Sequence, residues 1–114
     1  MRIERREDGP VTVLVIEGVI KLGESASTFS RCLEDLLEEG VRSVVIDLAS
    51  IDYVDSTGLG ELVGYLQKYT ERGRRLGLLN PQARILNLLK LTQLDETFPI
   101  FESLEQAVEE MGGD

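Results

Sequence analysis

The chain has 114 residues, 42% of them hydrophobic, which is the size and composition of one globular domain with a single core. Its formal charge of −9 argues against nucleic acid as a main partner, because duplex binding relies on Lys and Arg to neutralise phosphates. The sequence has no histidine and one cysteine, Cys32, which excludes histidine-based catalytic triads and a thiolate zinc site within one chain. We therefore expect a binding protein that is not an enzyme and that needs no metal or cofactor.

No apolar stretch approaches the ~20 residues that span a bilayer, so we expect no membrane insertion. The N-terminus does not lead from positive charge into an apolar run of signal-peptide length. A single cysteine also fits a reducing compartment. These features together predict a cytoplasmic protein.

The N-terminal half alternates strand and helix patterns. Residues 2–7 and 11–18 predict two antiparallel strands joined by a tight Gly-Pro turn, and residues 19–23 a short extended continuation. Apolar residues at helical spacing predict a helix over 24–39, which a glycine follows. A continuous β-branched apolar run predicts a strand over 43–48 that is covered on both faces.

The next helix has more start signals than a helix needs. Asp55 is the predicted N-cap, and the helix is expected to end near Gly73. Val54 and Leu59 then fall at the two positions of a hydrophobic staple, which fixes the angle at which the chain enters the helix.

Residues 74–80 predict a further strand, and Asn80 and Pro81 predict the N-cap and first residue of a third helix. Residues 98–101 form a short strand or extended segment, and Ser103 opens the last helix with a capping box. Alternating strands and helices imply right-handed crossovers. We expect one domain over residues 1–114 with an α/β fold: a mixed, mostly parallel central sheet, antiparallel N-terminal strands and about four helices.

The stretch DSTGLG at the start of the second helix is a candidate functional site. Functional loops of such sheets lie at the carboxyl ends of strands, and this stretch follows the predicted strand 43–48. With Asp55 as the cap, the hydroxyl of Ser56 is not needed for capping, and Gly58 and Gly60 remove side chains beside it. The pattern indicates a hydroxyl presented to another surface. A serine at a helix start is, however, most often only a cap, and glycines in a helix can serve tight internal packing.

Two other kinds of site are weaker interpretations of the same region. STGLG lacks the lysine and glycine spacing of a P-loop, and Asp52 and Asp55 would repel a phosphate. Metal binding through Asp47, Asp52 and Asp55 has no spacing signature. The acid-rich stretches of the helices are most simply solvated faces.

The sequence resembles the STAS domain family, and specifically the bacterial anti-sigma factor antagonists, along most of its length. The most specific stretch is VVIDLASIDYVDSTGLGELVGYL, and GLLNPQARILNLLKLTQL is similar to the next strand and helix of the family. The resemblance implies a protein that binds an anti-sigma factor with ATP-dependent serine-kinase activity and thereby releases a sigma factor. It also implies that phosphorylation of the serine after the motif aspartate, here Ser56, ends the binding, and that a PP2C-type phosphatase restores it.

The resemblance implies a partner-binding surface around this serine. After the first long strand many members carry an acidic residue in the pattern GE(I/L)D, whereas this chain has GVIK, with Val19 and Lys21 at those positions. The implied partner-binding residues are Lys21, Asp52, Asp55, Ser56, Thr57, Gly58, Leu59 and Gly60.

Two alternative functions belong to other classes. Related domains serve as subunits of stress-signalling or lipid-transport assemblies that this phosphorylation does not switch. Ser56, followed by a second hydroxyl residue and Gly-Leu-Gly, favours the switched antagonist over such a subunit. A nucleotide-binding or hydrolysing domain is disfavoured by the missing P-loop lysine.

Overall fold

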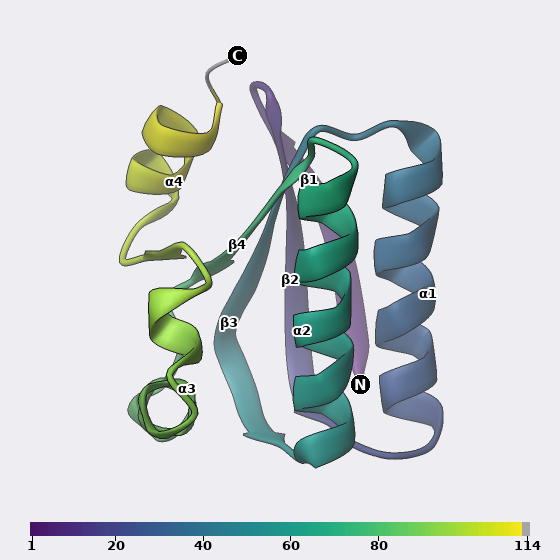
Figure 1. Ribbon diagram of the computed structural model, residues 1–114, viewed down its shortest axis with the longest axis vertical. Coiled ribbons are helices and arrows are strands. Elements are labelled where there is room, and N and C mark those ends of the chain that lie inside the picture. The colour runs from purple at the N-terminus through teal and green to yellow at the C-terminus, as the bar shows by residue number, and fades with distance from the viewer. Residues whose placement is uncertain (113–114) are drawn as a thin grey trace.

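Five strands form one mixed sheet at the centre of the computed structural model, which describes residues 1–112 (Figure 1). The strand order follows the chain, with β1 and β2 antiparallel and every other neighbouring pair parallel. This arrangement confirms the predicted α/β fold with antiparallel N-terminal strands. The strands are β1 (Arg2–Asp8), β2 (Val11–Ile20), β3 (Ser43–Val54), β4 (Arg75–Leu79) and β5 (Ile100–Phe101).

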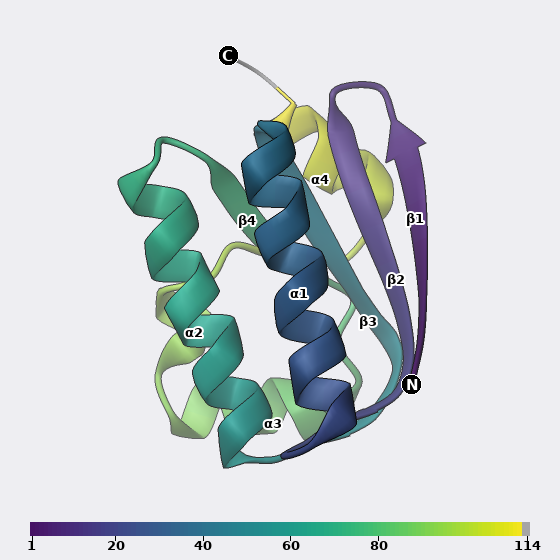
Figure 2. The ribbon, with the colours of Figure 1, turned by 90° about the vertical axis from the view of Figure 1, so that its right-hand side faces the viewer.

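Helices cover both faces of the sheet (Figures 1 and 2). α1 (Glu24–Glu39) and α2 (Ser56–Glu71) lie side by side on one face, while α3 (Ala83–Leu91) and α4 (Leu104–Met111) lie on the other. A short 3-10 turn, Leu94–Glu96, follows α3. The larger apolar core joins the sheet to α1, α2 and α3. A smaller core fills the space under α4: Val11, Val13, Val45, Leu79, Phe101, Ala107 and Met111.

Several turns form as their residues predict. α1 ends at Gly40, whose φ of 86° is the left-handed conformation that glycine adopts most readily. The Ser103 side chain caps α4 by accepting a hydrogen bond from Gln106 N at 3.1 Å. Gln106 Oε1 in turn accepts from the backbone N–H of Glu102, one residue earlier than the usual capping-box partner.

The predicted end of β3 is wrong by six residues. The strand continues to Val54 because its second half pairs with the end of β2, from Glu17 to Ile20. Two irregularities in this pairing shift the register, so that Ile51 and Val54 are buried at a spacing of three residues, where regular strand alternation has two. A spacing of three does not look like a strand in the sequence, which explains the error.

The predicted start of α3 is also wrong. Asn80 does not cap the helix; it has a φ of 51°, and its N–H donates to Phe101 O at 2.8 Å as the last rung of the sheet. The helix begins at Ala83, after Gln82 in an extended conformation. Asn80 is therefore a turn residue, a role that asparagine tolerates better than most residues.

Candidate functional site

The carboxylate of Asp55 ties the first turn of α2 to the end of β2. Asp55 Oδ1 accepts a hydrogen bond from Gly58 N at 2.8 Å, which confirms the predicted N-cap. Asp55 Oδ2 accepts from the backbone N–H of Leu22 at 2.9 Å, and Asp55 N donates to Ile20 O at 3.1 Å. The start of α2 and the β2–α1 loop are thereby held together at the lower end of the molecule in Figure 1.

These hydrogen bonds favour the ionised form of Asp55. The bond from Gly58 N, followed by that from Leu22 N, lowers the pKa of the Asp55 carboxyl below its ordinary 3.8, and the positive charge of Lys21 adds to the effect. A carboxyl whose pKa is lower in the folded state than in the unfolded state stabilises the fold at pH values above its ordinary pKa. That stabilisation is lost as the pH falls through the lowered value.

We expect Asp55→Asn to lower the melting temperature at neutral pH, because the amide is an uncharged and weaker acceptor for the two N–H groups. The difference in melting temperature between Asp55→Asn and the wild type should become smaller below about pH 4, because protonation there removes the charge of Asp55 in the wild type. Thermal melts between roughly pH 7 and pH 3 measure this difference. Asp8→Asn, in the exposed β1–β2 hairpin, serves as the control. A difference that stays constant with pH would contradict the role given to the Asp55 charge.

The two adjacent hydroxyl residues have different surroundings. Ser56 is exposed at the first position of α2, and within residues 1–112 no hydrogen bond engages its hydroxyl. Thr57 is half-buried and lines a groove between α1 and α2. Ser56 is therefore the hydroxyl that a modifying enzyme can approach directly.

The two glycines that follow have different roles. A Cβ at Gly58 would lie 2.6 Å from Ile20 O and 2.8 Å from Ile20 Cγ2, so the space beside Gly58 is already filled by β2. The prediction that this glycine makes room for a partner is wrong, because the close approach is internal. At Gly60, which is exposed, an added Cβ would meet no atom within 4 Å. Of these two glycines, Gly60 is the one that leaves open space at the surface.

We call Ser56 and the exposed residues close to it, Lys21, Leu22 and Gly60, the Ser56 surface. Not all of the remaining predicted site residues belong to it. Lys21 is exposed next to Asp55, and its backbone N–H donates to Ser25 Oγ at 2.9 Å. Leu59 is half-buried against the larger core, to which Val54 also belongs, as a staple requires. Asp52 points elsewhere: its Oδ1 accepts a long hydrogen bond of 3.4 Å from Gln82 Nε2, next to α3 on the other face of the sheet.

Two exposed apolar side chains near the ends of β2 and β3 were missed by the sequence interpretation. Leu22 is 75% exposed and follows β2, while Tyr53 is 48% exposed near the end of β3. The other large hydrophobic residues exposed among residues 1–112 are Met1 and Leu91. The backbone N–H of Leu22 donates to Asp55, and Leu22 lines the same groove as Thr57, so Leu22 lies close to Ser56. Tyr53 precedes Ser56 by three residues in the chain. The available signal for Leu22 was an apolar residue between Lys21 and Gly23 at the end of the extended continuation predicted over 19–23.

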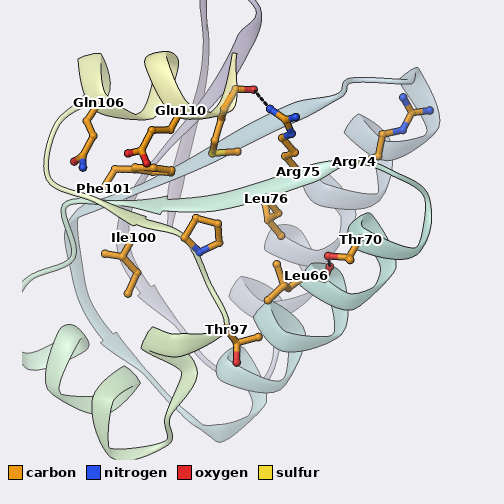
Figure 3. A pocket seen from close by; sticks show the side chains of 12 residues that line it. Leu66, Thr70, Arg74, Arg75, Leu76, Thr97, Ile100, Phe101, Gln106 and Glu110 are labelled. Carbon is orange, nitrogen blue, oxygen red and sulfur yellow. Dashed lines mark hydrogen bonds between the residues drawn. The ribbon is translucent and has the colours of Figure 1, made fainter. Parts of the chain in front are cut away.

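A separate hollow of about 510 Å³ lies between the later part of α2, the β4–β5 edge and α4 (Figure 3). Its apolar residues include Leu66, Leu76 and Phe101, and Arg75 at its border donates to Met111 O at 3.1 Å. Leu66 is ten residues beyond Ser56, or roughly 15 Å along the helix. The hollow is therefore distinct from the Ser56 surface.

The aspartates considered as metal ligands do not come together. Asp47 Oδ1 accepts from the N–H of Ala49, and within residues 1–112 no three His, Cys, Asp or Glu side chains are placed to share a metal ion. None of the helices described has the length and apolar character needed to cross a membrane.

The fold and the start of α2 define a small α/β domain that presents the exposed hydroxyl of Ser56 near the exposed side chain of Leu22. Residues 2–107 match the STAS domain, and the chain belongs to the STAS domain family, as its sequence predicted. The anti-sigma-B factor antagonist of Staphylococcus epidermidis is 35% identical over 77 residues, which are 64% of this chain and 71% of that protein.

Solved structures share the whole fold. The protein TM1081 of Thermotoga maritima matches with a TM-score of 0.90 at 24% identity, covering 97% of this chain and 95% of its own. The unphosphorylated form of the anti-sigma factor antagonist SpoIIAA matches with a TM-score of 0.72 at 15% identity, covering 99% of this chain and 100% of its own. At these identities the likenesses show the fold, and they confirm the predicted STAS architecture.

Proposed function

We propose that this chain is an anti-sigma factor antagonist whose binding is switched by phosphorylation of Ser56. In its unphosphorylated form it sequesters an anti-sigma factor that is also a serine kinase, and so releases a sigma factor. Phosphorylation ends the binding, and a PP2C-type phosphatase restores it. The observation that carries the proposal is the exposed, unengaged hydroxyl of Ser56 at the first position of α2.

The surroundings of Ser56 support a binding role. Exposed apolar side chains can be buried by a partner, and tyrosine is enriched among the interface residues that contribute most to affinity. The names of the relatives agree with this reading. The chain itself needs no catalytic group, because the partner enzymes perform both the phosphorylation and its reversal.

The test is to incubate the protein with ATP and an anti-sigma factor kinase from the same organism, and to map the modified residue by mass spectrometry. We expect phosphate on Ser56, lost in Ser56→Ala and retained in Thr57→Ala. Phosphate on Thr57 in the wild type would contradict the assignment. Tight binding of the kinase without any phosphorylation would favour a STAS subunit that works without this switch.

The two exposed apolar residues should act as anchors of the interface. We expect Leu22→Ala and Tyr53→Ala each to weaken binding of the kinase by roughly tenfold or more, because each removes apolar area that becomes buried at the centre of the complex. Isothermal titration calorimetry of the purified proteins measures the change. Leu91→Ala is the matched control, because Leu91 is 84% exposed at the far end of α3. Equal effects at all three positions would contradict a surface centred on Ser56.

A further inference from the structure

A groove with a volume of about 530 Å³ runs between α1 and α2 and begins beside Ser56. Figure 2 shows the two helices lying side by side above the sheet. One wall consists of Thr57, Glu61 and Tyr65, spaced four residues apart on α2. The other wall extends along α1 from Ala26 to Glu38, a rise of roughly 18 Å. That length matches about three turns of a helix.

The two helices are tied together along this groove. Ser30 Oγ donates to the hydroxyl of Tyr65 at 3.0 Å, and Lys68 Nζ forms an ion pair with Glu34 Oε1 at 2.7 Å. These contacts join side chains of α1 to side chains of α2 across the gap between the helices. The groove is thus already formed in the isolated domain.

The lining changes in character along the groove. The end nearest Ser56 is apolar and hydroxyl-bearing, with the exposed Leu22 and Ser27 and the buried Ala26. The other end carries Asp35 and Glu38 of α1, both exposed. Glu61 of α2 adds a third carboxylate nearer Ser56, one helical turn after Thr57. Within residues 1–112 no ion pair engages these three, and Arg31 is the one cationic side chain among the lining residues.

We propose that the anti-sigma factor lays a basic helical segment along this groove while it contacts Ser56. An apolar side chain of that segment packs on Leu22, and Lys or Arg side chains one to three turns away face Asp35, Glu38 and Glu61. Charge complementarity and the continuity of the groove with the Ser56 surface identify the occupant as part of the same partner. The inference rests on the proposed function and adds a second region of contact to it.

The experiment measures the affinity and the association rate of an anti-sigma factor kinase from the same organism for two charge variants. The groove variant is Asp35→Asn, Glu38→Gln, Glu61→Gln. The control is Glu102→Gln, Glu105→Gln, Glu109→Gln, which removes three charges at exposed positions near and within α4 on the other face of the sheet. At low salt we expect the groove variant to bind roughly tenfold more weakly and with a flatter salt dependence, and the control to stay within about twofold of the wild type.

A second variant tests occupancy without changing charge. Ser27 is exposed in the groove, so Ser27→Trp should obstruct the segment and weaken binding, whereas Gln67→Trp, exposed and outside the groove, should not. If the wild type binds and Ser56→Asp does not, but neither groove variant differs from its control, the groove proposal is overturned and the proposed function stands. If the wild type itself fails to bind the kinase, both proposals fail together.

Discussion

Ser56→Asp is expected to reduce affinity for the anti-sigma factor by roughly a hundredfold or more while leaving the melting temperature close to that of the wild type. The carboxylate stands in for a phosphate at a position that is exposed in the isolated domain. In the complex, the same negative charge must lose its water against a surface shaped for a neutral hydroxyl. Burying an unpaired charge at an interface costs several kcal/mol of binding free energy.

The isolated domain tolerates this charge because two local effects oppose each other. A negative group at the first position of α2 faces the positive end of the helix dipole, which stabilises it by up to ~1 kcal/mol at an exposed site. The ionised Asp55 next to this negative group destabilises it by a similar free energy. Asp52, whose carboxylate interacts with Gln82 on the other face, contributes less to this repulsion than its place in the sequence indicates.

Two measurements separate a switch at the interface from a loss of folding. Surface plasmon resonance gives the affinity for the kinase, and differential scanning calorimetry gives the melting temperature of each variant alone. Ser56→Ala should bind persistently and resist phosphorylation. Wild-type affinity in Ser56→Asp would contradict the switch. A large loss of thermal stability in Ser56→Asp would mean that the charge acts on the fold.

The overall fold follows from local patterns in the sequence. The helix over 24–39 and the capping box at Ser103 were predicted because each rests on contacts between neighbours in the chain. The strand over 43–48 was predicted because its continuous apolar run marks burial on both faces. The errors arose where distant residues decide the conformation. β3 continues to Val54 because β2 pairs with it across two register shifts, and Asn80 directly after β4 cannot cap α3 because its N–H is bound to Phe101 O.

The same distinction applies to the candidate site. The N-cap role of Asp55 depends on Gly58, three residues away, and the sequence predicted it. Its second bond, to Leu22 N, joins residues 33 positions apart and has no signature in the sequence. The exposure of Leu22 and Tyr53 likewise depends on how β2 and β3 end together.

Gly58→Ala is expected to destabilise the domain, although alanine is the better helix former. Alanine in place of glycine adds up to ~1 kcal/mol of helix stability. Its Cβ, however, would lie 2.6 Å from Ile20 O, a backbone atom that also accepts the N–H of Asp55. The overlap cannot be relieved by rotating a side chain, and inserting a methyl group into such a contact typically costs about 1–3 kcal/mol. We therefore expect a lower free energy of unfolding, by about 1 kcal/mol or more.

Gly60→Ala and Gly64→Ala are matched controls on the same helix, because an added Cβ at either position meets no atom within 4 Å. Urea denaturation should show both variants as stable as the wild type, or more stable by up to ~1 kcal/mol. Binding of the kinase should then distinguish the two: Gly60→Ala places a methyl group one helical turn from Ser56 and should bind more weakly, while Gly64→Ala, another turn further along α2, should bind as the wild type does. A Gly58→Ala protein as stable as Gly64→Ala would show that the end of β2 can move away from α2. That result would contradict a rigid contact between Gly58 and the backbone of Ile20.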